Sequence, residues 1–454
     1  MSEFSGARVL VIGLGRAGVG MSKALKAAGA ELTVVDQKSA DASTMLDALD
    51  EVSGLDIEII TSWAGDVDWN ETDLIAASPG VPRTHPALRE AVGREVPVLS
   101  EVEVAYRMAK APMLAVTGTN GKSTICALTY FILNECGKRA RLCGNVAGTG
   151  LPEETVTAAA ASAAPDEVLV TEVSSFHLDW VSRFRPVAAT ITQIVPDHLD
   201  RYDSFDEYAA AKRRIYANLR DDDVAIVNLL RPETLPPDGM GGVRLTLGER
   251  DADAVIPGEM VIFPESHVEL RVSELWTGGH HNLENAAVAV LLASTQGVSP
   301  ISAVEAVRRF TGLQNRMERL GEKRGVRFVN NSMCTNPRAV AASLESAPGP
   351  VLLLAGGVCK VDDLSPFEQC AKRTRQVFLY GKDAERIRSA VESAGCRPVM
   401  SDTLEEAFEC AASAAQSGDT VLLSPGCSSF DQFENFIERG RRFRELVKEW
   451  PDGG

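Results

Sequence analysis

The sequence lacks long apolar runs, cysteine pairs and an excess of positive charge, and each absence excludes a class of protein. No run of about 18 apolar residues occurs, and the N-terminus lacks the pattern of a secretory signal. The 46 Lys and Arg residues are outnumbered by 63 Asp and Glu, a net charge of −17 that argues against a nucleic-acid-binding protein. We therefore expect a cytoplasmic protein with neither nucleic acid nor a membrane as partner. An anionic ligand would need a local positive site.

The cysteines and histidines also lack the spacing that is typical of a disulfide framework or a zinc site. The nine cysteines are odd in number and include no C-x-x-C pair, and none of the six histidines has H-E-x-x-H spacing. We interpret the cysteines as reduced thiols, mostly in the core. The 454 residues suffice for about two to four domains that bury their own cores.

Short β-rich runs alternate with helical stretches along most of the chain, which indicates βαβ units and parallel sheets. In the first part of the chain the runs are ARVLVIG, ELTVVD, DLIAAS and PVLS, with helical stretches at Met21–Ala28 and His85–Val92. Residues 230–275 are rich in Pro and Gly and predict small antiparallel strands, and residues 157–165 predict a helix end with a surface loop.

This pattern predicts an α/β protein with three domains in series. They are a Rossmann-like N-terminal domain over residues 1–103, a central P-loop ATPase-like domain over 104–311, and a Rossmann-like C-terminal domain over 312–454.

A glycine-rich turn follows the first β-rich run. Gly13, Gly15 and Gly18 are spaced as in a dinucleotide-binding fingerprint, and Asp36 ends the next run. Such a turn brings backbone amides near a phosphate, as in NAD-binding proteins. A tight turn required only for packing explains the same glycines equally well.

A second glycine-rich segment, Gly118-Thr-Asn-Gly-Lys-Ser-Thr124, lies between an apolar run and a helical stretch. Backbone amides and a helix N-terminus can hold phosphate oxygens there, Lys122 adds a cation, and the Ser123 or Thr124 hydroxyl can reach Mg²⁺. Val116 stands where the general phosphate-loop pattern has its first glycine. The segment predicts ATP binding.

Polar residues further along could converge on the same phosphates. Glu172, the run Asp197-His198-Leu199-Asp200 and Lys212 follow β-rich runs or lie on the next helix, and such donors suit an Mg²⁺ shell. Any one of them taken alone could equally be a solvated surface group. Asn282 and Asn285 share one face near a helix start, where capping or contact with a nucleotide base is equally sensible.

Together these segments resemble the Mur ligase family. The resemblance rests on GTNGKST, EVSSFHL, DHLDRY, AAAKRRI, HNLENA, GLQNRME, NNSMCTN and LSPGCSSFDQFENFIERG, which occur in family order over nearly the whole chain. The segments IGLGRAG and SPG at 78–80, with the SFDQF ending, are most similar to the members that add D-glutamate.

The resemblance implies an ATP-dependent acid–amino-acid ligase of peptidoglycan precursor synthesis. ATP would phosphorylate the carboxylate of UDP-N-acetylmuramoyl-L-alanine, and the amine of D-glutamate would attack the acyl phosphate, releasing phosphate as the amide forms. The alternative is a Mur ligase paralogue that adds a different amino acid, such as L-glutamate. A non-catalytic Mur-like subunit and an NAD-dependent oxidoreductase are weaker hypotheses. We expect a monomer.

The resemblance also assigns residues to each ligand. For the UDP-substrate they are Gly15, Arg16, Asp36, Ser78, Gly80 and Asn145; for ATP they are Gly118, Thr119, Asn120, Gly121, Lys122, Ser123, Thr124, Asn282, Asn285, Arg316 and Asn331. Lys122, Glu172, His198 and Lys212 would be catalytic, and Ser123, Glu172, His198 and a carbamylated Lys212 would hold Mg²⁺. Thr335, Lys360, Ser429 and Phe436 would bind the amino acid.

The chain departs from the family pattern at several of these places. Asn331 and Met333 stand where the family usually has the Asp and Lys of D-S-K-A-T-N, Asn315 replaces a usual histidine, and His177 replaces an amide residue. Because one acid and one base are lost together, the first two changes could be a coupled neutralisation.

Overall fold

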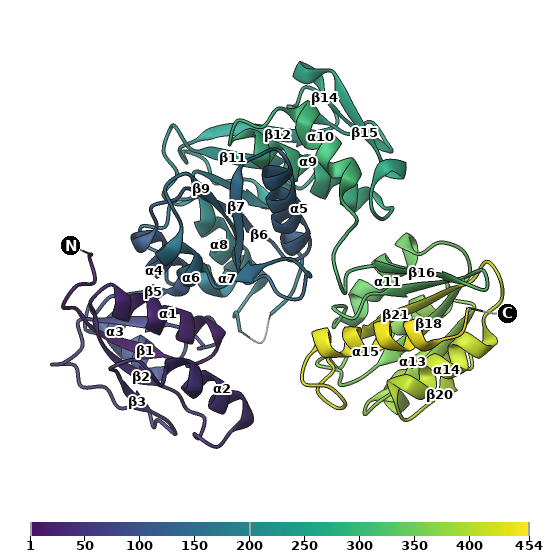
Figure 1. Ribbon diagram of the computed structural model, residues 1–454, viewed down its shortest axis with the longest axis horizontal. Helices are drawn as coiled ribbons and strands as arrows, with labels where there is room; N and C mark the ends of the chain where they lie inside the picture. The colour runs from purple at the N-terminus through teal and green to yellow at the C-terminus, as the bar shows by residue number, and fades with distance from the viewer. Residues whose placement is uncertain (1, 199–200, 453–454) are drawn as a thin grey trace. The chain divides into compact units, whose positions relative to one another are not determined.

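The computed structural model describes residues 2–198 and 201–452 and groups them into two compact units (Figure 1). Unit 1 comprises Met1–Ala147, Pro152–Arg271 and Leu283–Phe310; unit 2 comprises Gly148–Leu151, Val272–Asn282 and Thr311–Gly454. Unit 1 contains two sheets and unit 2 contains one.

The first sheet of unit 1 has five parallel strands in the order β3-β2-β1-β4-β5. The strands are β1 (Arg8–Ile12), β2 (Glu31–Val35), β3 (Glu58–Ile60), β4 (Leu74–Ala77) and β5 (Val98–Ser100), alternating with α1 (Arg16–Ala27), α2 (Ser43–Val52) and α3 (Pro86–Gly93). The expected helix Met21–Ala28 begins earlier, at Arg16, directly after the glycine turn. The expected helix at His85 begins at Pro86, because the His85 ring caps it by accepting from the Ala87 N–H at 3.3 Å.

The second sheet of unit 1 has ten strands in the order β15-β14-β13-β12-β11-β10-β6-β9-β7-β8. They are β6 (Met113–Thr117), β7 (Arg139–Gly144), β8 (Glu153–Glu154), β9 (Glu167–Glu172), β10 (Ala188–Ile191), β11 (Val224–Asn228), β12 (Val243–Gly248), β13 (Ala254–Val255), β14 (Met260–Phe263) and β15 (Val268–Arg271). The expected antiparallel strands occur only at the far edge. There β14 pairs antiparallel with β13 and β15, whereas β12 and β13 continue the parallel order.

Seven α-helices among the described residues flank this sheet, and one of them, α6, covers most of the alanine-rich segment at 157–165. They are α4 (Glu101–Met108), α5 (Lys122–Glu135), α6 (Val156–Ser162), α7 (Ser175–Leu178), α8 (Phe205–Arg213), α9 (His280–Ser294) and α10 (Pro300–Arg309). The alanine-rich segment at 157–165, expected as a helix end and surface loop, is largely the helix α6. Its small side chains let it pack closely on α1 and α4, with Ala159 and Ala160 buried.

Unit 2 contains a six-stranded sheet in the order β16-β17-β21-β18-β19-β20, parallel except for the β16–β17 hairpin. The strands are β16 (Glu318–Lys323), β17 (Val326–Asn330), β18 (Val351–Gly356), β19 (Gln376–Tyr380), β20 (Val399–Met400) and β21 (Thr420–Gly426). The helices are α11 (Pro337–Ser346), α12 (Ser365–Ala371), α13 (Ala384–Ser393), α14 (Leu404–Ala414) and α15 (Phe436–Glu449). The α/β class with mostly parallel sheets is confirmed, and the boundaries at 103 and 311 stay a prediction.

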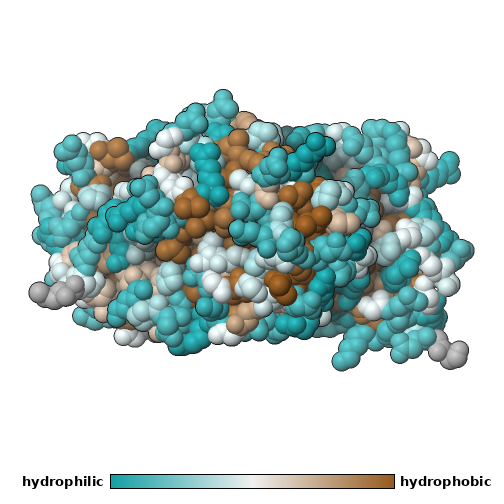
Figure 2. Space-filling view, turned by 90° about the horizontal axis from the view of Figure 1, so that it is seen from above, coloured by the Kyte–Doolittle hydropathy of each residue, from teal (hydrophilic) through white to brown (hydrophobic). Residues whose placement is uncertain are grey.

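Most apolar side chains are buried, and the surface is mainly polar. Each sheet carries apolar side chains on both faces under its helices, as expected for parallel strands. Figure 2 shows a face on which hydrophilic residues dominate and apolar ones occur in small groups. Among residues 2–198 and 201–452, no helix is both long and apolar enough to cross a bilayer.

The close approach of α1 to the glycine turn generates a stability prediction. A Cβ on Gly18 would overlap the carbonyl oxygen of Gly13, whereas a Cβ on Gly15 would meet nothing. Gly18→Ala should therefore destabilise unit 1 by about 1–3 kcal/mol. Gly15→Ala should cost less, about 0.5 kcal/mol, because its Cβ has space and only the poorer N-cap of α1 counts against it. Thermal unfolding followed by circular dichroism measures both, and equal melting temperatures for the two variants would contradict the packing argument.

Candidate active site

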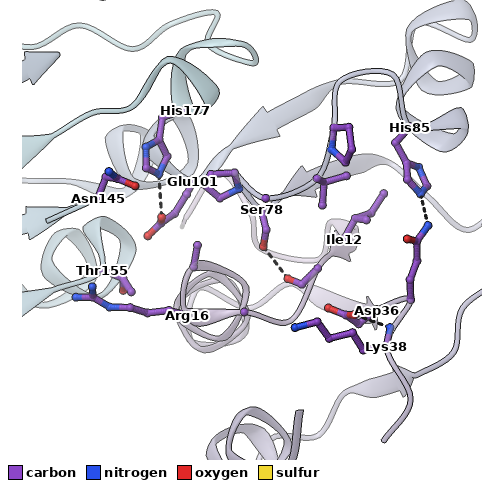
Figure 3. Close-up of a pocket in the computed structure, with 18 of the residues that line it drawn as sticks. Ile12, Arg16, Asp36, Lys38, Ser78, His85, Glu101, Asn145, Thr155 and His177 are labelled. Atoms are coloured by element: carbon purple, nitrogen blue, oxygen red, sulfur yellow. Dashed lines mark hydrogen bonds and ion pairs between the residues drawn. The ribbon is translucent and has the colours of Figure 1, made fainter. Parts of the chain in front are cut away.

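A cavity of about 600 Å³ lies in unit 1 where loops of the first sheet meet loops of the second (Figure 3). It is lined by the six residues that the resemblance assigns to the UDP-substrate, Gly15, Arg16, Asp36, Ser78, Gly80 and Asn145. The structure thus brings together residues that lie up to 130 positions apart, as the Arg16 guanidinium illustrates by donating to the Val146 carbonyl at 3.0 Å.

The glycine turn in this cavity is held by side-chain hydrogen bonds. Asp36 accepts from the Leu14 N–H at 2.7 Å and from the Lys38 N–H at 2.8 Å, and the Ser78 hydroxyl donates to the Gly13 carbonyl at 2.6 Å. Gly13 has φ +92°, a conformation that favours glycine. Asp36 and Ser78 therefore shape the turn.

Several cavity residues have no sequence motif that could have revealed them. The Trp63 and His85 rings stack with centroids 5.5 Å apart, and the Gln37 amide lies 3.1 Å from His85 Nε2. Burial lowers the pKa of His85, which favours its neutral form. Together these groups form a partly apolar wall of the cavity.

A buried carboxylate–imidazole pair forms another part of the wall. Glu101 Oε2 lies 3.2 Å from His177 Nε2, and the Thr157 hydroxyl donates to Glu101 Oε1 at 3.2 Å. On its other side the His177 ring meets the Ser174 hydroxyl at 3.0 Å. His177, one of the departures from the family pattern, is therefore held between Glu101 at the start of α4 and Ser174 just before α7.

The phosphate loop follows β6 and leads into α5. Gly118 and Gly121 have φ of +141° and +85°, and a Cβ on Gly118 would overlap the Thr192 hydroxyl, so glycine is needed there. The Thr192 hydroxyl donates to the Asn120 carbonyl at 2.5 Å, and Lys122 Nζ donates to the Thr119 carbonyl at 2.9 Å. The loop is thus braced from β10 and presents the N-terminus of α5, a position suited to phosphate.

Lys212 reaches this loop from α8 and is only 2% exposed. Its Nζ donates to the Gly118 carbonyl at 2.7 Å and lies 4.6 Å from the centre of the Tyr208 ring. Burial, helped by the positive charge of Lys122, lowers the pKa of Lys212 to about 6. At neutral pH the amine is therefore largely uncharged.

Glu172 ends β9 beside the phosphate loop and is 2% exposed. Its Oε1 accepts from the Asn145 amide at 3.0 Å, whereas Oε2 is buried and has no hydrogen-bond partner among the residues that the structure describes. His198 has φ +53° and packs edge-on against Phe176 at 4.9 Å. Leu199 and Asp200 of the expected acidic cluster lie outside the described residues, and among those described no three His, Cys, Asp or Glu side chains form a preformed metal cage.

The remaining residues assigned to ATP fall in both units. In unit 1, Thr119 and Asn120 lie in the phosphate loop, Ser123 and Thr124 lie in the first turn of α5, and Asn285 Oδ1 lies against Gly121. In unit 2, Asn282 is the third residue of α9, so it is not the helix cap, and its amide donates to the Gly278 carbonyl at 3.0 Å.

The departures at 331 and 333 have local partners in unit 2. Asn331 is buried; its amide donates to the Ser343 hydroxyl at 2.7 Å and its oxygen accepts from the Met317 N–H at 3.2 Å. The Met333 sulfur contacts the Arg316 guanidinium. A neutral amide suits the hydroxyl partners of Asn331, and a lysine at 333 would place two cations side by side. Each change is thus accommodated by different partners, and the coupling of the two changes stays a prediction.

The four residues assigned to the amino acid occur at or after the carboxyl ends of neighbouring strands in unit 2. Thr335 follows β17, Lys360 follows β18, and Ser429 and Phe436 follow β21. Lys360 is exposed, with Nζ 5.7 Å from the centre of the Phe430 ring, whereas Ser429 is buried. The Phe436 carbonyl accepts from the Ser332 hydroxyl at 2.7 Å, which joins two of these loops.

Parallel sheets with a phosphate loop at a helix N-terminus, and polar residues gathered at carboxyl strand ends, define a nucleotide-binding α/β protein. Family models agree: residues 7–100 match the Mur ligase MurD-like N-terminal domain, 116–293 the Mur ligase middle domain, and 315–427 the Mur ligase glutamate ligase domain. The chain belongs to the Mur ligase family, as the resemblance in its motifs indicated.

Individual relatives cover almost the whole chain. Proteins from Pelotomaculum thermopropionicum and Acidobacterium capsulatum, both named UDP-N-acetylmuramoylalanine--D-glutamate ligase, are 36% and 37% identical over 98% of this chain and 98% and 97% of their own. Among solved structures, the UDP-N-acetylmuramate-alanine ligase MurC from Thermotoga maritima has a TM-score of 0.62 at 18% identity, covering 98% of this chain and 100% of that one. That likeness supports the fold.

The buried amine of Lys212 predicts a pH-dependent stability. Its pKa falls from 10.5 to about 6 on folding, so between these values the unfolded chain binds more protons and stability rises with pH. We compare the unsubstituted protein with Lys212→Met in bicarbonate-free buffer. The free energy of unfolding of the unsubstituted protein, minus that of the variant, should increase as the pH rises from about 6 to 10.5. Urea unfolding at several pH values measures the difference, with the exposed Lys23→Met as control. A pH-independent difference would contradict the burial argument.

Proposed function

We propose that the chain is an ATP-dependent ligase that adds D-glutamate to UDP-N-acetylmuramoyl-L-alanine in peptidoglycan precursor synthesis. The observation that carries this proposal is the set of relatives named as this ligase, which align over 98% of the chain at 33–37% identity. We assign the UDP-substrate to residues 1–103, ATP to 104–311 and the amino acid to 312–454.

The cavity of unit 1 supports the assignment of the UDP-substrate. Backbone amides at Gly15 and the cations Arg16 and Lys38 line a space that also has the Trp63–His85 wall. Amides and cations suit a diphosphate, and stacked rings suit a flat base. Asn145 lies in the cavity and also donates to Glu172, so it joins the UDP-substrate site to the phosphate loop.

ATP would be held by the phosphate loop, with Gly118–Thr124 around its phosphates and Asn282, Asn285, Arg316 and Asn331 around the rest of the nucleotide. Transfer of the terminal phosphoryl group to the substrate carboxylate makes an acyl phosphate, a better electrophile than the carboxylate. The chain contributes mainly position and charge, because phosphoryl transfer depends on both. Lys122 would supply positive charge next to the transferred group.

Mg²⁺ fits the donors beside this loop. A buried carboxylate oxygen without a partner, as in Glu172, is a hard donor that a divalent cation would satisfy, and the Ser123 hydroxyl starts the adjacent helix. We assign Ser123, Glu172 and His198 to the metal. When bound, the ion would neutralise phosphate charge during transfer.

Lys212 would take part through its uncharged amine. A neutral amine can add carbon dioxide, forming an N–C bond and releasing a proton, which turns the side chain into a carbamate. Its low pKa and its position at the Gly118 carbonyl support this assignment. A carbamylated Lys212 would carry negative charge toward the metal.

The incoming amino acid would lie at the carboxyl edge of the sheet in unit 2. The exposed Lys360 suits a carboxylate of glutamate, and Thr335, Ser429 and Phe436 lie at or after neighbouring strand ends. The alternative is a paralogue that adds a different amino acid, such as L-glutamate, which Met333 and Cys334 suggest. It is not favoured, because the relatives carry the D-glutamate name and both residues have partners within unit 2.

A turnover assay tests the proposed function. Purified protein is incubated with ATP, Mg²⁺ and UDP-N-acetylmuramoyl-L-alanine, with D-glutamate or L-glutamate as the variable, and phosphate release and the coupled product are measured. We expect product with D-glutamate and none with L-glutamate, and Lys122→Ala should abolish turnover. Product formed only with L-glutamate, or with neither enantiomer, would refute the proposal.

The role of Lys360 gives a separate prediction. Removing a charge-assisted contact costs about 1.5–3 kcal/mol, so Lys360→Met should raise the KM for D-glutamate about tenfold or more. The KM for ATP should stay unchanged. Lys372→Met, which removes an exposed lysine from the end of α12, serves as the control. An unchanged D-glutamate KM would show that Lys360 does not hold the substrate.

A further inference from the structure

Two cysteines face each other across a short antiparallel contact in unit 2. The loop after β18 and the loop after β21 are joined by a bridge between Val358 and Ser428, in which each residue donates to the other at 2.9 Å. In antiparallel register the next pair is Cys359 opposite Cys427. A pair next to a doubly hydrogen-bonded one brings its Cα atoms to about 4.5 Å with the side chains close.

The sulfur atoms agree with this register. Cys359 Sγ and Cys427 Sγ are 2.6 Å apart. Disulfides need Cα atoms about 4.4–6.8 Å apart, a range that includes this kind of pair. The two thiols are therefore positioned for a covalent bond with little movement of the backbone.

Hydrogen bonds that do not involve the sulfur atoms hold both loops that the Val358–Ser428 bridge joins. The Cys359 N–H donates to Asp383 at 2.7 Å. On the other strand, the fully buried Arg439 donates to the Cys427 carbonyl at 3.1 Å and to the Ser332 carbonyl at 2.8 Å. Because these anchors involve the backbone, they persist whether the thiols are reduced or oxidised.

The two cysteines differ in access. Cys359 is half-buried and Cys427 is buried, so a reagent in solution reaches Cys359 first. The hydrogen bond from the Cys427 thiol lowers the pKa of Cys359, with a smaller contribution from Arg386. A half-buried thiol with a lowered pKa, next to a second thiol, is the arrangement of reversible redox sites.

We propose that Cys359 and Cys427 form a reversible intramolecular disulfide, a redox modification site in the C-terminal part of the chain. With a low-molecular-weight disulfide as oxidant, the Cys359 thiolate attacks one of its sulfur atoms and releases one thiolate. Cys427, deprotonated, then attacks Cys359 Sγ and releases the second. The two protein thiols lose two electrons and two protons, and the small disulfide is reduced to two thiols.

The disulfide would act on the amino-acid site, an effect that rests on the proposed function. Lys360 follows Cys359 directly, and Ser429 lies two residues after Cys427. A crosslink between their loops limits the adjustment of both residues around the incoming amino acid. Oxidation therefore raises the KM for D-glutamate several-fold and leaves the KM for ATP unchanged.

Peptide mapping of the full-length protein tests the modification. The protein is treated with oxidised glutathione, free thiols are alkylated, and the digest is analysed by mass spectrometry. The expected product is a peptide pair linking Cys359 to Cys427, lighter by two hydrogen atoms and separated by dithiothreitol. Retained glutathione on Cys359, a link from Cys427 to Cys334, or no oxidation of the pair would overturn the proposal.

Two serine variants isolate the pair. Cys359→Ser should prevent the link and make the D-glutamate KM insensitive to the oxidant, whereas Cys410→Ser, at an exposed cysteine of α14, should change neither response.

A link without any change in KM would overturn the effect on the amino-acid site. If the reduced protein does not turn over D-glutamate but the link forms, the proposed function fails and the redox site stands. Turnover without a link refutes the redox site and leaves the proposed function intact.

Discussion

The proposed ATP site depends on the buried carboxylate of Glu172, which ends β9 in the second sheet of unit 1. A charged oxygen without a partner is costly in a protein interior unless a cation or a hydrogen-bond donor meets it. Asn145 satisfies one oxygen of Glu172, and the other remains open beside the phosphate loop. The backbone of Glu172 is fixed in this position because β9 pairs with a strand on each side. Glu172 is in register with Val116 of β6 and with Gly144 of β7.

The strand order explains how separate motifs reach one place. The order β10-β6-β9-β7 puts four carboxyl ends side by side, so Thr192, the phosphate loop, Glu172 and Asn145 emerge at one edge. Lys212 then comes from α8 and donates to Gly118. On a chain of net charge −17, anions can bind only where such local amides and cations outweigh the overall field.

Local spacing predicted much of this arrangement, and long-range packing accounts for the rest. The phosphate loop was predictable because its glycines, lysine and hydroxyls are contiguous, and the three α/β domains followed from alternating runs. The Trp63–His85 wall and the Glu101–His177 pair were not predictable, because the partners in each pair are 22 and 76 residues apart and no motif contains both of them. The prediction of a helix end and loop over residues 157–165 was right that a helix ends there, at Ser162, but missed that the helix covers most of the segment and is buried. Composition does not reveal that α1 and α4 cover it.

The dependence of nucleotide affinity on Mg²⁺ tests the role of Glu172 most directly. Calorimetric titration of ADP into the unmodified protein and into Glu172→Gln is compared over a range of Mg²⁺ concentrations, with Glu167→Gln at the opposite end of β9 as control. We predict that Mg²⁺ strengthens ADP binding to the unmodified protein and the control, and that Glu172→Gln needs about tenfold or more Mg²⁺ for the same effect. The same Mg²⁺ dependence in all three proteins would contradict the role of Glu172.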